Sequence, residues 1–310
     1  MAVYSKLVRP IPEGPVDVVG DVHGEIEALN DLLAHLGYET DGRHPEGRRL
    51  VFVGDLIDRG PDSPGVLRKV RRMVEDGRAL TVLGNHELNL LRGLNKGFDN
   101  AWFFKGLTAS QQAEMIELMT GLPIALERPD LRVAHANWHD DSVDIARNAN
   151  CPVELYEEHE LLIEEFLTQN PELGRLETAL LKQNQNPVKR ITSGPEQALT
   201  PGTQPSGERA FQQRETWWDT YVGPLCVVGH YWRSQDVEQP THNHLFDDTR
   251  PHALLGLGHV MCVDYSVGKR FQERQRKGAD FKGPFHLRLG ALRLPERLLV
   301  FDDGATVPVA

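Results

Sequence analysis

The stretch "LVFVGDLIDRGPDSPGVL" (residues 50–67) passes from an apolar run through a polar cluster into a helical pattern. Its apolar start has the length and composition of a strand that is buried on both faces. Gly54 lets the backbone turn sharply where this strand ends, and Asp55 and Arg59 follow there. Residues 66–77 then place their apolar side chains along one face of a helix. The stretch therefore predicts a strand, a polar turn and a helix.

An apolar run with a polar end recurs along the chain, and we expect a strand at each copy. These runs are "VDVVGD" (16–21), "RLVFVGD" (49–55), "LTVLGN" (80–85), "LRVAH" (131–135), "LCVVGH" (225–230) and "VMCVD" (260–264). A further helical pattern covers residues 25–38. The alternation of strand and helix over the first 90 residues predicts a doubly wound α/β unit. In such a sheet, ligands bind beyond the carboxyl ends of the strands, where the polar clusters lie.

The middle and the end of the chain have other patterns. Residues 154–169 predict an acidic amphipathic helix. Residues 182–216 contain Asn-Pro, Ser-Gly-Pro and Thr-Pro-Gly, which predict a long loop or a partly ordered insert. Residues 285–303 alternate like two strands of a hairpin. We expect a single domain over 1–310, with a helical and loop insert at about 138–222.

The composition of the chain limits the kinds of partner that the protein is expected to bind. The formal net charge of −11 argues against long-range attraction to nucleic acid or to an anionic membrane. No apolar run approaches the roughly 20 residues of a membrane span, and the start lacks a secretory signal. Residues 269–277, "KRFQERQRK", predict a solvated basic loop, which could also recruit a polyanionic substrate. The cysteines are far apart in the sequence, which favours buried, reduced thiols in a cytoplasmic protein. They are Cys151, Cys226 and Cys262.

The polar strand ends together offer carboxylate, amide and imidazole donors without a thiolate. They are Asp21, His23, Asp55, Asn85, His135 and His230. This mixture suits divalent ions such as Mn²⁺, Fe²⁺ or Zn²⁺. A catalytic zinc typically takes three protein ligands, so the set is too large for one such ion. It fits two ions that share a bridging carboxylate.

Each motif has another interpretation when it stands alone. "GDVHG" (20–24) is compatible with an ordinary turn, "GDLIDRG" (54–60) with a turn that exposes an ion pair, and "GNHE" (84–87) with a hairpin turn. A single histidine at a strand end carries little information. Three glycine-led polar groups in order, each between an apolar run and a helical pattern, favour the metal site.

These three motifs, in this order, resemble the calcineurin-like metallophosphoesterases of the phosphoprotein-phosphatase branch. Within it, the chain is similar to a bacterial group that includes protein phosphatases and symmetrical dinucleoside-tetraphosphate hydrolases. The resemblance is dense over residues 16–137 and returns at "VVGHYW" and "VDYSVG". It implies an α/β fold in which two mixed β-sheets pack as a sandwich flanked by helices.

The resemblance also implies a role for each site residue. The implied metal ligands are Asp21 and His23 for the first ion, Asp55 as the bridge, and Asn85, His135 and His230 for the second ion. His86 would donate a proton to the leaving oxygen, Asp58 would keep His86 charged, and Arg59 would grip the phosphate. Asn85 would also face the substrate. Two divalent ions are expected, Mn²⁺ first, with Fe or Zn as alternatives.

The resemblance implies a second phosphate-binding arginine between His135 and His230. Arg190 is the candidate we prefer, and the others are Arg209, Arg214 and, just beyond that interval, Arg233. Glu87 is expected to shape its turn or to begin the following helix, and Asp264 is expected to have a structural role.

The predicted function is two-metal hydrolysis of phosphate esters, with phosphoserine, phosphothreonine or small phosphomonoesters as substrates. The alternative is a symmetrical Ap4A-type dinucleoside polyphosphate hydrolase, whose bases could stack on tryptophans. These are Trp138, Trp217, Trp218 and Trp232. A third possibility is a binding protein that has kept the fold and lost the chemistry. The expected partners are a phosphorylated protein, a small phosphate ester or a nucleotide, with no nucleic acid and no membrane.

Overall fold

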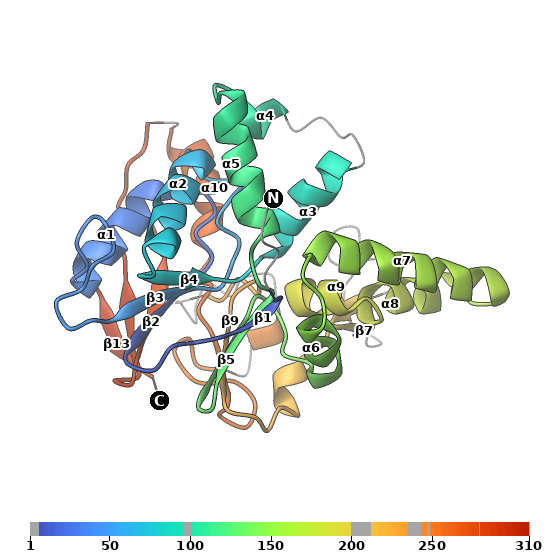
Figure 1. Cartoon of the computed structure of the whole chain (residues 1–310). Coiled ribbons are helices and arrows are strands. Elements are labelled where there is room, and N and C mark those ends of the chain that lie inside the picture. Colours follow the sequence, from blue (N-terminus) through green and yellow to red (C-terminus); the bar gives the residue numbers. More distant parts are fainter. Residues whose placement is uncertain are drawn as a thin grey trace.

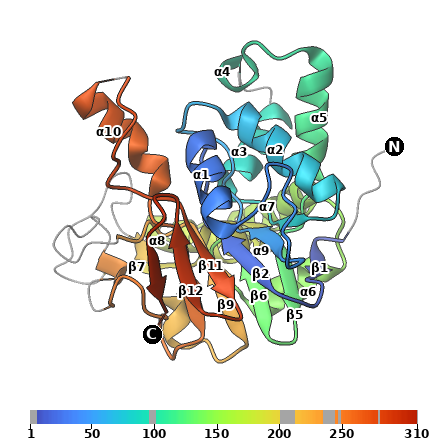
Figure 2. The ribbon, with the colours of Figure 1, turned by 90° about the vertical axis from the view of Figure 1, so that its left-hand side faces the viewer.

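The computed structural model describes residues 6–95, 101–199, 212–234, 244–246, 249–278 and 280–309. One sheet has the strand order β13-β12-β11-β2-β3-β4. Its strands are β2 (Val16–Val19), β3 (Arg49–Phe52), β4 (Ala79–Thr81), β11 (Gly290–Leu294), β12 (Leu298–Phe301) and β13 (Thr306–Pro308). β2, β3 and β4 are parallel, whereas β11 pairs antiparallel with β2 and with β12. Figure 2 shows β12, β11 and β2 side by side. The sheet is therefore mixed, and the predicted hairpin near the chain end is confirmed.

The second sheet has the order β1-β5-β6-β9-β10. Its strands are β1 (Val8–Pro10), β5 (Ala125–Arg128), β6 (Leu131–Ala134), β9 (Leu225–Val228) and β10 (Val260–Cys262). β6, β9 and β10 run parallel, and β5 pairs antiparallel with β6. All six strands that the sequence predicts from apolar runs are present.

The two sheets pack face to face because their strands bury side chains on both sides. Val18 and Val51 of the first sheet share an apolar cluster with Val133 and Val227 of the second. Their sequence neighbours, such as Phe52, point the other way into the cluster that holds the helices. This alternation, with a period of two residues, builds the sandwich. The fold that the resemblance implies is confirmed.

Helices cover the outer faces (Figure 1). α1 (Ile26–Leu36) and α2 (Ser63–Glu75) connect β2, β3 and β4, and both bury the apolar face predicted for them. The other helices before β6 are α3 (Asn85–Asn95), α4 (Ala101–Phe104) and α5 (Ala109–Thr120). Those between β6 and β7 are α6 (Asp140–Arg147), α7 (Pro152–Gln169), α8 (Arg175–Asn184) and α9 (Pro187–Ser193). Figure 1 shows α7 and α8 reaching away from the sheets. α7 confirms the predicted acidic helix.

Of the two alternatives for residues 182–216, a long loop is wrong for the described part of that segment, which is compatible with a partly ordered insert. α8 extends to Asn184, and α9 begins at Pro187, where the Asn186 side chain caps it by accepting from Lys189 N. β7 (Glu196–Ala198) and β8 (Gln212–Arg214) then form a two-stranded sheet. Asn-Pro here begins a helix, since proline is favoured in the first turn. Residues 200–211 lie outside the described residues.

The basic stretch 269–277 is also not a loop. It forms α10 (Arg270–Lys277), directly after the short helix η3 (Val267–Lys269). Arg270 is buried against Asp302 at 2.6 Å, and Glu273 accepts from two backbone N–H groups. These buried polar contacts hold the helix in place. The remaining short helices are η1 (Trp217–Asp219) and η2 (His244–Phe246).

The described residues bear on two predictions from composition. None of the helices that they form is long and apolar enough to cross a membrane. Cys151, Cys226 and Cys262 are free and buried, as expected.

Candidate metal centre

The polar strand ends of the two sheets meet at one place. Asp21, Asp55 and Asn85 follow β2, β3 and β4, whereas His135 and His230 follow β6 and β9 of the other sheet. His135 Nε2 lies 3.3 Å from Asp55 Oδ2. The backbone N–H of His230 donates to Asp21 Oδ2 at 3.1 Å. Packing of the sheets thus joins residues that are far apart in the sequence.

Asp55 stands at the centre of this cluster. Within the described part of the chain, two triplets have donor atoms that all lie within 4.8 Å of one another, and Asp55 belongs to both. One triplet adds His23 and His86, and the other adds His135 and His230. A shared carboxylate between two donor groups is the arrangement that a bridged pair of ions needs.

Asn85 and the histidines are aimed at the same place. Asn85 Oδ1 lies 2.8 Å from His230 Nδ1 and 3.1 Å from His135 Nε2. His135 Nδ1 contacts Val53 O, and His23 Nδ1 contacts the carbonyl of Ile57. A carbonyl only accepts, so each Nδ1 carries a proton, and both Nε2 atoms point toward the cluster. Backbone carbonyls commonly orient metal-binding histidines in this way.

The loops that carry these residues have unusual backbone conformations. His23, Asp55, Asp58, Arg59 and His230 all have positive φ, between 47° and 73°. Residues with a side chain adopt this region rarely, and such strain gathers at functional sites.

Glu87 holds this loop conformation. Its buried carboxylate accepts from the N–H groups of Asp55, Leu56, Ile57 and Gly84. The expected role of Glu87 in shaping the turn is confirmed.

Two glycines are required by the close approach of the carboxylates. A Cβ atom on Gly84 would collide with Asp55 Oδ1, and one on Gly229 would collide with Asp21 Oδ1. Gly84 and Gly229, which precede the predicted ligands Asn85 and His230, therefore serve the packing of the site as well as the turn.

The electrostatics of the cluster fit a bound cation. Burial, followed by the charges of Asp264 and Asp55, raises the pKa of Asp21 well above its usual range. Burial lowers the pKa of His23 to about 3, and His23 Nε2 has no hydrogen-bond partner among the described residues. Buried carboxylates and an unpartnered imidazole nitrogen are expensive without a counterion. Oxygen and nitrogen donors of this kind fit divalent ions.

His86 lies beside the ligands and has its own partners. His86 Nδ1 lies 2.5 Å from Asp58 Oδ2, and His86 Nε2 lies 3.3 Å from Arg59 Nη2. Burial opposes the charged form, but Asp55 and the hydrogen bond with Asp58 raise the pKa of His86 overall. The structure brings together the three residues that the sequence suggested for proton transfer and phosphate binding.

The tryptophans do not all face the site. Trp138, Trp217 and Trp218 are buried, and Trp138 Nε1 donates to Asp140 Oδ1. These three are core residues, so the idea that they stack on bases is wrong. Trp232 is half-buried, and its ring centroid lies 4.6 Å from the Arg59 guanidinium carbon.

The second phosphate-binding arginine is not identified by contacts. Arg190 Nη1 donates to Asn184 O, and among the described residues no hydrogen bond joins Arg190 to a predicted ligand. Arg233 is buried and donates to the carbonyls of Arg250 and Ala253, which is a structural role. Arg214 lies over the Tyr231 ring. Arg209 lies outside the described residues.

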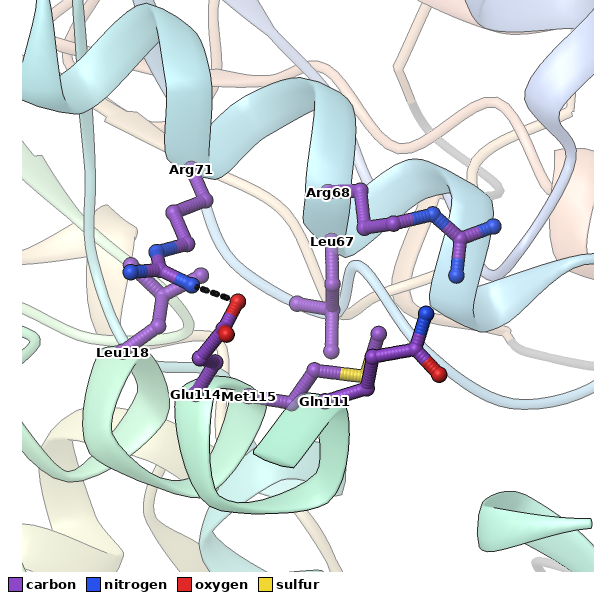
Figure 3. A pocket seen from close by; sticks show the side chains of 7 residues that line it. All are labelled: Leu67, Arg68, Arg71, Gln111, Glu114, Met115 and Leu118. Atoms are coloured by element: carbon purple, nitrogen blue, oxygen red, sulfur yellow. Dashed lines mark hydrogen bonds and ion pairs between the residues drawn. The ribbon is translucent and has the colours of Figure 1, made fainter. Parts of the chain in front are cut away.

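A separate hollow lies between α2 and α5 (Figure 3). Its side chains include Leu67, Met115 and Leu118, and Arg71 pairs with Glu114 across it. It contains none of the predicted site residues, so it adds nothing to the metal centre.

Comparison with known proteins identifies the family of the chain. Residues 14–199 match the family model for calcineurin-like phosphoesterases. An asymmetrical bis(5'-nucleosyl)-tetraphosphatase from Geobacillus sp. (strain WCH70) is 32% identical over 148 residues, covering 41% of this chain and 59% of that protein. A symmetrical one from Janthinobacterium sp. (strain Marseille) is 39% identical over 121 residues, covering 38% and 42%. The chain spans less than two thirds of the length of these curated relatives.

A solved structure shares the fold across nearly the whole chain. The cold-active protein-tyrosine phosphatase of a psychrophile, Shewanella sp., superposes with a TM-score of 0.56 at 16% identity. The match covers 97% of this chain and 81% of that one.

Proposed function

The chain belongs to the calcineurin-like phosphoesterases, and from this premise we propose that it hydrolyses phosphate esters at a two-metal centre. The observation that carries the proposal is the position of Asp55, which is shared by two groups of converging donors. The two predicted sets of ligands are Asp21, His23 and Asp55 for one ion, and Asp55, Asn85, His135 and His230 for the other. Mn²⁺ is the ion we favour, with Fe or Zn as alternatives. The free, buried cysteines support a cytoplasmic location.

The metals supply one part of the chemistry. When bound, two divalent ions would polarise the phosphoryl group and lower the pKa of a water molecule. The side chains of the protein supply substrate binding and proton transfer.

Arg59 and His86 act together in this proposal. Arg59 Nη2 lies 3.3 Å from His86 Nε2, so in this geometry Arg59 donates and His86 keeps its proton on Nδ1, toward Asp58. When a phosphate group binds the planar guanidinium of Arg59, the guanidinium donates to the phosphate oxygens and no longer to His86 Nε2. His86 Nε2 can then carry a proton and deliver it to the leaving oxygen, while Asp58 stabilises the charged imidazole.

Two substrate classes are compatible with this site. Phosphoserine, phosphothreonine and small phosphomonoesters need a proton donor for an alkoxide leaving group, which His86 would provide. Dinucleoside tetraphosphates are the second candidate, and they are supported by the similarity to bis(5'-nucleosyl)-tetraphosphatases. Both classes use the same metal centre.

Comparing turnover of Ap4A with that of a phosphoserine peptide, in the presence of Mn²⁺, separates the two classes. Hydrolysis of p-nitrophenyl phosphate alone would reopen both substrate assignments. Absence of bound metal together with absence of any hydrolysis would favour a binding protein that has lost the chemistry.

A further inference from the structure

The segments after β9 and β10 are tied together by the carboxylate of Asp264. Asp264 Oδ2 accepts from Trp232 N at 2.8 Å, and Asp264 Oδ1 accepts from Ser266 N at 2.8 Å. Trp232 and Ser266 both have positive φ, at 50° and 66°. Such conformations are costly and persist only where the surroundings enforce them. Asp264 therefore fixes the relative position of the two segments.

The second segment brings a lysine to the edge of the metal centre. η3 follows Ser266, and the Lys269 N–H donates to Ser266 O at 2.9 Å. Gly268 lies so close to His23 that a Cβ atom would collide with the imidazole ring. Lys269 thus directly follows Gly268, whose backbone lies against the predicted metal ligand His23.

Two cations rest against the same indole ring. Lys269 Nζ lies 4.1 Å from the Trp232 ring centroid, and the Arg59 guanidinium carbon lies 4.6 Å from it. The attraction of a cation to an aromatic ring accounts for both positions. Trp232 therefore holds the two positive groups near each other.

These cations have no ion-pair partner among the described residues. Across the part of the chain that the structure describes, no carboxylate lies within ion-pair distance of Arg59 or Lys269, and the nearby Asp264 is occupied by two backbone N–H groups. Burial and the charge of Arg59 lower the pKa of Lys269, although Asp264 raises it. Two close, half-buried cations with unused N–H donors favour an anion.

We propose that Arg59 and Lys269, held on Trp232, bind two successive phosphate groups of a substrate that carries a phosphate chain. This inference rests on the proposed function, because Arg59 contacts His86 and so lies at the phosphate that is cleaved. Lys269 has no polar contact with His86 or with a predicted ligand among the described residues, so it takes the neighbouring phosphate. Trp232 and Asp264 are positioning residues. The substrate class is a nucleoside polyphosphate or inorganic polyphosphate in preference to a monoester.

The test measures anion binding to the Mn²⁺-loaded protein by titration calorimetry at a fixed concentration of free Mn²⁺. The probes are orthophosphate, with one phosphate group, and imidodiphosphate, with two phosphate groups and a bridge that resists hydrolysis. Lys269→Met should weaken binding of imidodiphosphate by about 10- to 100-fold, the range for one hydrogen bond to a charged group. The loss for orthophosphate should be about tenfold smaller than that for imidodiphosphate. Lys269→Arg should retain most of the preference for imidodiphosphate over orthophosphate.

Two further variants complete the design. Lys277→Met is the matched control, because Lys277 ends α10 and its Nζ lies 4.4 Å from the Phe281 ring, and it should change neither affinity. Trp232→Leu should weaken both anions, since both cations lose their support.

The inference is overturned if Lys269→Met weakens the two anions equally or weakens neither, or if the unaltered protein shows no preference for imidodiphosphate. Binding is measured without turnover. A protein that binds as expected but hydrolyses no phosphate ester would refute the proposed function and leave this inference standing.

Comparing ADP and inorganic pyrophosphate as inhibitors of p-nitrophenyl phosphate hydrolysis then distinguishes a nucleotide from an inorganic chain. Stronger inhibition by ADP would indicate that the site also contacts the nucleoside.

Discussion

Replacing His86 by alanine tests whether this residue donates a proton to the leaving group. His86 borders the predicted ligand Asn85, and its ring nitrogens contact Asp58 and Arg59, so both metals should remain bound in the variant. General acid catalysis typically contributes about 100- to 10,000-fold, and kcat for a phosphoserine peptide should fall within that range. p-Nitrophenolate leaves as a stable anion, so kcat for its ester should fall by less than about tenfold.

The partner of His86 provides the matched variant. Asp58→Asn keeps an oxygen near His86 Nδ1 but removes the charge from a 2.5 Å hydrogen bond. A hydrogen bond to a charged group contributes about 1.5–3 kcal/mol, which corresponds to about 10- to 100-fold in kcat for the phosphoserine peptide. As in His86→Ala, kcat should therefore fall more for the phosphoserine peptide than for p-nitrophenyl phosphate, but both losses should be smaller. Stopped assays of both substrates, with metal content measured on each protein, decide the matter. Equal losses for both substrates at unchanged metal content would show that His86 orders the site instead of donating a proton.

Three other substitutions test the supports of the site and of the fold. Asp55→Asn should lower the content of both metals together, and loss of a single metal with activity near the original level would contradict the bridging role. Glu87→Gln leaves backbone N–H groups of the metal-site loops without acceptors, which should cost about 3 kcal/mol or more of unfolding free energy in urea and lower the metal content. Asp17→Asn removes the buried carboxylate that pairs with Arg48 and accepts from Tyr38, so urea unfolding should show a loss of about 3–5 kcal/mol. Unchanged kcat in folded, metal-loaded Asp17→Asn protein would confirm that this effect is on stability alone.

The parts of the fold that were predictable are those specified by local pattern. Each strand end needs an apolar run of four to six residues followed by a glycine or a ligand, and both features lie within a few neighbouring residues. The contact between Asp55 and His135, at 3.3 Å, joins the two sheets, and it was predictable only through the resemblance to a family. Nothing in the spacing of the two residues specifies that their strands face each other.

The errors arise where tertiary packing decides the outcome. Asn186-Pro187 has the composition of a turn, but the same pair caps and begins α9 once the neighbouring helices pack on it. Trp138 follows the predicted ligand His135 closely in the sequence, and its aromatic ring suggested a base-stacking residue at the mouth of a pocket. It is instead buried in the apolar cluster that holds the helices, and the Arg132 guanidinium carbon lies 4.6 Å from its ring.

The cluster of Trp232, Lys269 and Arg59 was beyond the reach of sequence analysis for a related reason. Trp232 was one of several tryptophans, and Lys269 was one of several cations in a basic stretch. Their proximity depends on the two bonds that Asp264 makes to backbone N–H groups. A carboxylate that accepts from the backbone has no distinctive neighbours in the sequence.

Two buried carboxylates that are not predicted ligands thus organise the site. Glu87 fixes the loops of the first sheet by accepting backbone N–H groups from the turns after β3 and β4, and Asp264 does the same for the turns after β9 and β10 in the second sheet. The turn after β3 and the turns after β9 and β10 contain residues with positive φ, so Glu87 and Asp264 supply the constraint that such backbone strain requires.

The two carboxylates should also make the turns respond to metal binding. Burial raises the pKa of Glu87 to about 7 and also raises that of Asp264, so both groups are sensitive to the charge placed beside them. Cations bound at Asp55 favour the ionised form of both carboxylates, which is the better acceptor for backbone N–H groups. Metal binding should therefore rigidify the turns that carry Arg59 and Trp232. Amide hydrogen exchange at those turns should slow when Mn²⁺ is added, and equal exchange with and without Mn²⁺ would show that the turns are already fixed without metal.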